Sequence, residues 1–221
     1  MKAFRDNACL QNVACLGRVV LGFSALTAVL SCSNQPPPIL VPKIDPAAAA
    51  REAVAHFDRN GNGALESEEI IRCPGLVDAK DRIDTDGDGK LTLEELTKRF
   101  GQYVAEGIGV ISFVGTVYFN NQPVEGARVT LEPEEFWHGG LRAAEGVTDS
   151  AGHFRVKTLG LDVDGAQPGI YRIRVSKTAV DGKEIIPTYY NTESHLGAEI
   201  AVDSKVALEG LEIRIAQRRA P

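Results

Sequence analysis

The chain has 221 residues, of which 43% are apolar and 24% are charged, and its formal net charge is -6 at pH 7. This length fits one or two domains, and the composition is that of an ordinary globular protein. The acidic balance gives no electrostatic reason to expect a nucleic-acid partner, because such partners usually require a basic face. An acidic surface instead favours solubility and the binding of cations.

The first 31 residues predict a signal peptide. Basic residues come first, and the uncharged run "VVLGFSALTAVLS" follows at residues 19–31. This run is too short for a membrane span, which needs about 20 apolar residues, but it has the length of the apolar core of a secretory signal. The Pro-rich stretch at residues 32–45 then predicts an extended tether.

The end of the predicted signal peptide, "VLSC" at residues 29–32, resembles the bacterial lipobox. This resemblance implies cleavage before Cys32 and attachment of lipid to it. The exported protein would then be anchored to a membrane of the cell envelope and face the periplasm or the exterior. Leu30 departs from the pattern, which prefers a small or β-branched residue at that position. An ordinary secreted protein that is cleaved nearby is therefore the alternative.

One cysteine, Cys73, lies outside the predicted leader and the lipid site. A cysteine without a pairing partner is most often a small buried apolar residue. The alternative is a reactive thiol, for which the neighbouring Arg72 is the only sequence signal.

Four short helices are predicted between residues 45 and 107. The first begins at Asp45, a favourable N-cap, with Pro46 at the first helical position. Pro74-Gly75 is expected to end the second helix. In the last helix, Leu93, Leu96 and Phe100 recur at helical spacing and predict a buried face. The predicted ranges are 45–57, 67–72, 76–83 and 92–107.

Two acidic stretches between these helices, "DRNGNGALESEE" (58–69) and "DTDGDGKLTLEE" (84–95), have the spacing of calcium-binding loops. Calcium takes six to eight oxygen ligands, and a 12-residue loop supplies them from positions 1, 3, 5, 7, 9 and 12, with glycine at position 6. Both regions resemble the EF-hand family, which implies two Ca²⁺ sites. The alternative is a pair of Asp/Asn-Gly turns in an acidic linker. The predicted ligands are Asp58, Asn60, Asn62, Ala64 (carbonyl), Glu66 and Glu69 in the first loop, and Asp84, Asp86, Asp88, Lys90 (carbonyl), Thr92 and Glu95 in the second.

The two predicted sites differ in charge and lie close together. Three carboxylates are among the side-chain ligands of the first loop and four are in the second, so we expect the second site to bind calcium more tightly. The loops start 26 residues apart (84 − 58), about ten fewer than in ordinary pairs of the family. Short helices have little apolar surface to expose, and the only methionine is Met1. The sequence therefore predicts a structural staple rather than a sensor, which typically opens a Met-rich groove.

Short, partly alternating runs of β-branched residues begin at residue 109. Gly, Pro, Asn and Asp punctuate these runs, which predicts a β-sandwich or barrel. In "YRIRV" (171–175), Tyr171, Ile173 and Val175 are expected to face the core, with the arginines on the other face. The predicted strand regions are 109–119, 126–134, 152–159, 169–177, 199–203 and 210–216.

Three stretches in this region, at residues 115–133, 146–158 and 164–177, resemble the carboxypeptidase regulatory-like domain. The resemblance implies a seven-stranded transthyretin-like sandwich over residues 109–217, in a family that is usually non-catalytic. One branch of the transthyretin superfamily hydrolyses 5-hydroxyisourate and ends in a Tyr-Arg-Gly-Ser-like motif. This chain ends in "AQRRAP", so that activity does not carry over.

The predicted fold is therefore α+β in two parts, an all-α, short-spaced EF-hand pair (46–106) followed by the all-β sandwich. No flexible linker separates the two parts, so we expect them to pack against each other.

The predicted function is that of a non-catalytic, envelope-anchored structural or binding module with two Ca²⁺ ions. The loop "EEFWHGG" (134–140) is a candidate contact for a protein or glycan partner through Trp137 and His138. The alternative is that Phe136 and Trp137 cap the edge of the sandwich. Two other functions stay open: a dockerin-like adhesion or assembly module, and an accessory subunit of an envelope enzyme.

Overall fold

The computed structural model describes residues 41–161 and 163–216. The helical and β parts both belong to one compact unit. The predicted signal peptide and lipid site at Cys32 lie outside the described residues. None of the helices in the described ranges has the length and apolar character needed to cross a membrane.

The helical part contains α1 (Pro46–Phe57), α2 (Ser67–Ile70), α3 (Pro74–Ile83) and α4 (Leu93–Ala105). Its two calcium-loop candidates are joined by a short antiparallel ladder, β1 (Ala64–Leu65) with β2 (Leu91–Thr92). Asp45 caps α1 as predicted, because its side chain accepts a hydrogen bond from the Ala48 amide at 3.0 Å. Leu96 and Phe100 are fully buried, whereas Leu93 is 39% exposed, so its predicted place in the core is wrong.

Helix α3 differs from its predicted range because Pro74 and Gly75 begin it. Proline is favoured at the first helical position, where its missing N–H costs no hydrogen bond. Gly75 fits there because the helix lies directly against a β-sheet. A Cβ at Gly75 would come within 2.8 Å of the Tyr171 carbonyl oxygen, and one at Gly197 within 2.2 Å of the Gly75 nitrogen. The Pro-Gly pair therefore starts a helix at a close backbone contact.

The β part contains two sheets between residues 115 and 215. The larger is an antiparallel sheet in the order β10-β9-β5-β6-β8. In the smaller, β3 pairs with β11 in parallel and with β4 and β7 antiparallel. The bounds are β3 (Gly115–Phe119), β4 (Gln122–Pro123), β5 (Arg128–Pro133), β6 (Ala144–Val147), β7 (His153–Phe154), β8 (Lys157–Thr158), β9 (Gly169–Ser176), β10 (Leu196–Ile200) and β11 (Leu211–Ile215). Two 3-10 turns, η1 (Glu135–Trp137) and η2 (Thr188–Tyr190), and the short helix α5 (Lys205–Glu209) complete the described elements.

The buried face of the β part agrees with the sequence prediction, but the number and the bounds of its strands differ from it. Tyr171, Ile173 and Val175 are buried as expected, and the arginines between them are half-buried. The described residues contain nine strands in this part, three of them only two residues long, instead of seven. Strand β6 was not predicted, because "AEGV" lacks apolar alternation. Strand β10 begins three residues before the predicted range.

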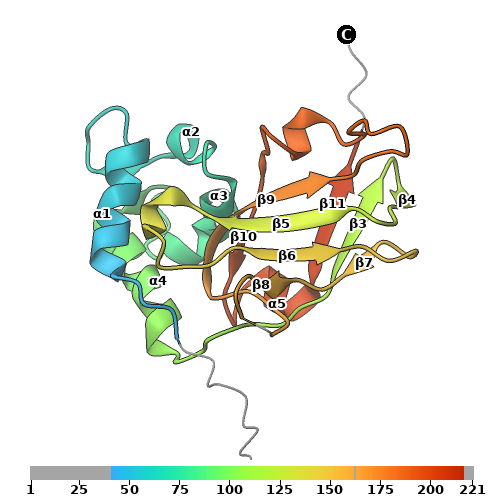
Figure 1. Cartoon of the computed structure of the whole chain (residues 1–221). Helices are drawn as coiled ribbons and strands as arrows, with labels where there is room; N and C mark the ends of the chain where they lie inside the picture. Colours follow the sequence, from blue (N-terminus) through green and yellow to red (C-terminus); the bar gives the residue numbers. More distant parts are fainter. Residues whose placement is uncertain (1–40, 162, 217–221) are drawn as a thin grey trace, which may run out of the picture. The chain divides into compact units, whose positions relative to one another are not determined.

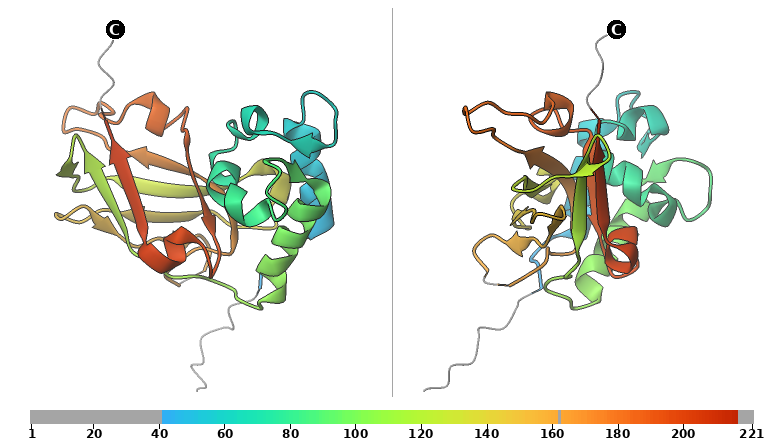
Figure 2. Two further views of the ribbon diagram at one scale, coloured as in Figure 1. Left: turned by 180° about the vertical axis from the view of Figure 1, so that it is seen from behind. Right: turned by 90° about the vertical axis from the view of Figure 1, so that its right-hand side faces the viewer.

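The helical and β parts share one core, which confirms the prediction that they pack against each other. Helices α1 to α4 gather at one end of the sheets, and α3 lies along β10 and β9 (Figures 1 and 2). On α4, Phe100 stacks on Phe136 with ring centroids 5.6 Å apart, and its ring centroid lies 4.6 Å from that of Trp137. This aromatic cluster joins α4 to the loop that follows β5.

Candidate metal centre

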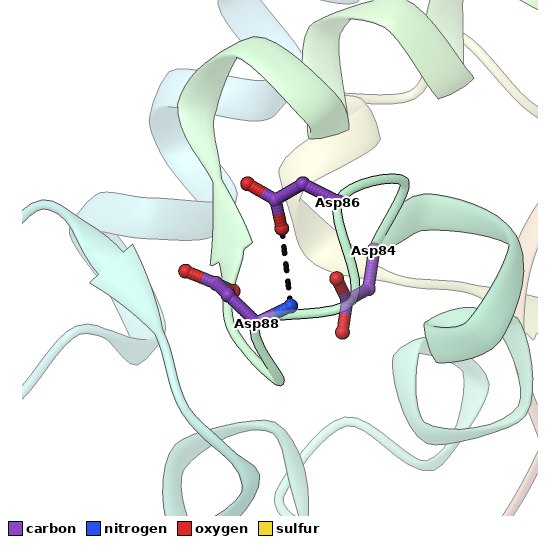
Figure 3. A group of neighbouring side chains, drawn as sticks. All are labelled: Asp84, Asp86 and Asp88. Atoms are coloured by element: carbon purple, nitrogen blue, oxygen red, sulfur yellow. Dashed lines mark hydrogen bonds between the residues drawn. The ribbon is translucent and has the colours of Figure 1, made fainter.

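The second loop folds around Asp84, which directly follows α3. Its two carboxylate oxygens accept hydrogen bonds from the amides of Gly87 and Gly89, at 2.7 and 2.9 Å. The Asp86 carboxylate accepts one from the Asp88 amide at 3.1 Å. These bonds bend the chain so that one carboxylate oxygen from each of the three aspartates lies within 4.8 Å of the others (Figure 3). Within the part that the structure describes, no other group of three His, Cys, Asp or Glu side chains converges this closely.

Glu95 closes the second loop from the first turn of α4. It is 8% exposed, and its oxygens accept hydrogen bonds from the amides of Thr85 and Thr92 at 2.8 and 3.0 Å. The Thr92 hydroxyl in turn accepts one from the Glu95 amide, which completes a capping box at the start of α4. Loop positions 9 and 12 are therefore also the residues that begin the exiting helix.

The charge of Glu95 is favoured by its hydrogen bonds. Partial burial acts to raise the pKa of this carboxyl, but the bonds from Thr92 and Thr85 outweigh it and hold the pKa below the usual glutamate range. The second loop thus brings the carboxylates of Asp84, Asp86 and Asp88 together, whereas the Glu95 carboxylate is held on the backbone of Thr85 and Thr92 and is not part of that group. Hard oxygen donors of this kind suit calcium.

The first loop repeats this hydrogen-bond pattern. Asp58 accepts hydrogen bonds from Gly61 and Gly63 at 2.7 and 2.8 Å, and Glu69 accepts them from Arg59 and Glu66 at 2.7 and 3.0 Å. The glycines at positions 4 and 6 have φ values of 73° and 85° here, against 75° and 85° in the second loop. These left-handed conformations favour glycine because a side chain would be strained. The backbones of the two loops are therefore alike.

The two loops differ in how their side chains are used. In the first loop, the amide groups of Asn60 and Asn62 donate to the Glu66 carboxylate at 3.1 and 2.5 Å. The hydrogen bond from Asn62 is the largest cause that lowers the pKa of Glu66, to about 2. Two neutral amides thus stand at positions 3 and 5, where the second loop has two aspartates.

Lys90 adds a contact that the sequence did not predict. Only its carbonyl was a predicted ligand, but its ammonium group lies 3.2 Å from the Glu66 carboxylate of the other loop. The β1–β2 ladder makes this possible, because Ala64 pairs with Thr92 and Leu65 with Leu91. Leu65 and Leu91, at position 8 of each loop, are both fully buried. The sequence gives one signal for this contact, which is that Lys90 directly precedes the two residues, Leu91 and Thr92, that pair with the first loop.

The comparisons with known proteins support the second loop. The family model for the EF hand matches residues 81–100, from the end of α3 to the middle of α4. No curated protein and no solved structure showed a significant similarity to the chain. The match and the aspartate cluster together indicate calcium binding in this region.

The predicted contact loop at residues 134–140 is not built as expected. Trp137 is only 3% exposed and its indole N–H donates to the Ile170 carbonyl, so its predicted role as an exposed anchor is wrong. Phe136 and Trp137 instead pack under α4, which agrees with the alternative of a capped sandwich edge. His138 stays exposed, 3.8 Å from the carboxylate of Glu52 in α1.

A cavity of about 430 Å³ lies beside this loop, between α1, the end of β5 and β9. Most of its charged lining groups are already paired, as in the ion pairs Arg174–Glu132 and Arg172–Glu134 at 2.5 and 3.3 Å. Cys73 packs nearby and is fully buried. Burial, and the nearby Glu134 charge, raise the pKa of this thiol, so the reactive-thiol alternative is wrong and the apolar reading is confirmed.

Proposed function

We propose that the protein binds two calcium ions, one in each loop, and that these ions act as a structural staple. The observation that carries the proposal is the shared hydrogen-bond pattern of the two loops, joined back to back through Leu65 and Leu91. The family match supports the second site, and the equivalent backbone of the first loop supports the other. Each ion would be held by the six ligands predicted for its loop.

The staple role is supported by the short, packed helices between the loops. Helix α2 has four residues, and α3 is fixed on β9 and β10 by the contact of Gly75 with Gly197. A sensor must move such helices apart to open an apolar groove. Here Leu76 and Ile83 of α3 and Leu96 and Phe100 of α4 are already buried in the core shared with the β part.

The proposal is tested by calorimetric titration of the full chain with calcium. We expect two ions per chain in the wild type and one in each of the variants Glu69→Gln and Glu95→Gln, because each removes the bidentate ligand of one loop. The second site, which remains in Glu69→Gln and has four carboxylate ligands, should bind calcium more tightly than the first site, which remains in Glu95→Gln. Wild-type binding of one ion or none would refute the two-site proposal, and the reverse affinity order would refute the charge argument.

We further propose that the protein is exported and anchored to the cell envelope by lipid on Cys32, with the helical and β parts forming a non-catalytic module there. The support is the signal-peptide pattern and the lipobox-like "VLSC". Incorporation of a labelled fatty acid should be seen in the wild type and lost in Cys32→Ala. Equal labelling of the two, or none in either, would contradict the lipid anchor.

A further inference from the structure

One buried carboxylate joins the β part to both helices that flank the second loop. Glu199, in β10, is fully buried. One of its oxygens accepts from the Arg82 guanidinium of α3, and the other accepts from the Arg99 guanidinium of α4 at 2.6 Å and from the Tyr103 hydroxyl. A single side chain of the sheet therefore holds the entering helix and the exiting helix at the same time.

These contacts lie close to the calcium ligands along each helix. Arg82 is two residues before Asp84, the first ligand of the second loop. Glu95, Arg99 and Tyr103 are spaced four residues apart and are all buried on one face of α4. The groups that bind Glu199 and the glutamate that closes the loop therefore share one helical face.

The surrounding charges complete the network. Arg99 also donates to both carboxylate oxygens of Asp203, at 2.7 and 2.9 Å. Asp78 pairs with Arg82 at 3.3 Å and accepts the Glu199 amide N–H at 3.0 Å. Fork-shaped guanidinium contacts of this kind fix direction as well as distance. The network therefore fixes the positions of α3 and α4 on the sheet.

The protonation states suit this role. Burial acts to lower the pKa of Arg99, but its bonds to Asp203 and Glu199 outweigh that effect and raise it. Burial, and next the Glu199 charge, raise the pKa of Tyr103. Arg99 thus stays a cation and Tyr103 a neutral donor at ordinary pH.

We propose that Glu199 is a positioning residue for the second calcium site. By fixing α3 and α4 together, it keeps Glu95 folded over the loop before calcium arrives. This inference rests on the proposed calcium function. It adds that the affinity of the second loop is set partly by the β part, some 100 residues further along the chain. By linkage, calcium must also strengthen the docking of the helices on the sheet.

The test compares calcium affinities of the full chain in backgrounds that isolate each loop. In the Glu69→Gln background, which leaves the second site, Glu199→Gln should weaken binding about tenfold, within the usual range of coupling between sites. In the Glu95→Gln background, which leaves the first site, the same change should have much less effect. If Glu199 only stabilised the fold, Glu199→Gln would weaken calcium binding at both sites alike. Glu212→Gln is the control, because Glu212 forms an exposed ion pair with Arg214 on β11.

Unchanged second-site affinity in a folded Glu199→Gln protein, or equal weakening of both sites, would overturn the inference. If this variant does not fold, Tyr103→Phe decides, because it removes one hydrogen bond to Glu199 and keeps every charge. That variant should weaken the second site selectively, and unchanged affinity would overturn the inference. Absence of calcium binding in the unsubstituted protein is a different result, because it refutes the proposed function itself.

Discussion

Individual carboxylates in this protein take opposite roles according to their surroundings. Glu95 accepts backbone hydrogen bonds that hold its pKa low, which prepares it as an anionic ligand. Glu134 is equally buried, at 8% exposure, but among the described residues its Oε1 makes only the ion pair with Arg172 at 3.3 Å and no hydrogen bond. Burial raises the pKa of Glu134 above its usual value, although the Arg172 charge opposes the shift. The surroundings of Glu95 therefore favour its charged form, whereas the burial of Glu134 disfavours its charged form.

Glu134 gives a pH dependence whose sign follows from this shift. Because the pKa is higher in the folded state, the stability that the group contributes is complete below the unfolded value of about 4.5 and is lost as the pH rises through the folded value. The glutamine side chain of the variant Glu134→Gln does not titrate, so this variant lacks that pH dependence. The free energy of unfolding of the wild type should therefore fall relative to that of Glu134→Gln as the pH rises above about 4.5.

Denaturant unfolding in chelator, which removes calcium effects, measures this difference. Glu212→Gln, which removes an exposed carboxylate, is the control for the loss of one charge. A wild type that gains stability over Glu134→Gln with rising pH would contradict the assigned direction.

Helix α3 lies in close contact with the backbone of the sheet. A methyl group at Gly75 would meet the Ile170 side chain and the Tyr171 backbone, and the sheet cannot move away easily. We expect Gly75→Ala to lower the free energy of unfolding by about 1–3 kcal/mol, the usual cost of overpacking. Gly101, in α4, has no atom within 4 Å of an added Cβ, so Gly101→Ala should raise stability by about 0.5–1 kcal/mol.

Denaturant unfolding of the two glycine variants provides a matched comparison within two helices of the same part. Both variants should keep two calcium ions per chain, because neither substitution touches a loop. Equal stability changes would mean that α3 is not held by this contact.

The elements that the sequence predicted are those with local signals. The positions of the loop glycines and the Asp45 cap follow from residues close together in the chain. Strand β6 has no such signal, since it is held by pairing with β5 and β8. The start of α3 at Pro74 was missed because its reason, contact of Gly75 with β9 and β10, lies about 100 residues away. The Glu199 network could not be predicted for the same reason.

At the scale of the whole molecule, the helical and β parts are coupled by both apolar and charged contacts. The aromatic cluster of Phe100, Phe136 and Trp137 and the Glu199 network both cross the junction. Ligand that binds only the folded state stabilises it by about 2.7 kcal/mol at a concentration 100-fold above Kd. Because the two parts share one core, that stabilisation should reach the sheets as well as the loops.

Thermal unfolding of the full chain in calcium and in chelator tests the staple most directly. Far-UV circular dichroism follows the secondary structure of both parts, and fluorescence of Trp137, the only tryptophan, follows their junction. We predict one transition, coincident by both signals, whose Tm rises by about 10–20 °C when calcium exceeds the Kd of each of the two sites 100-fold, for a chain of this size. A Tm that calcium does not change, or calcium-induced binding of a dye specific for exposed apolar surface, would contradict the staple.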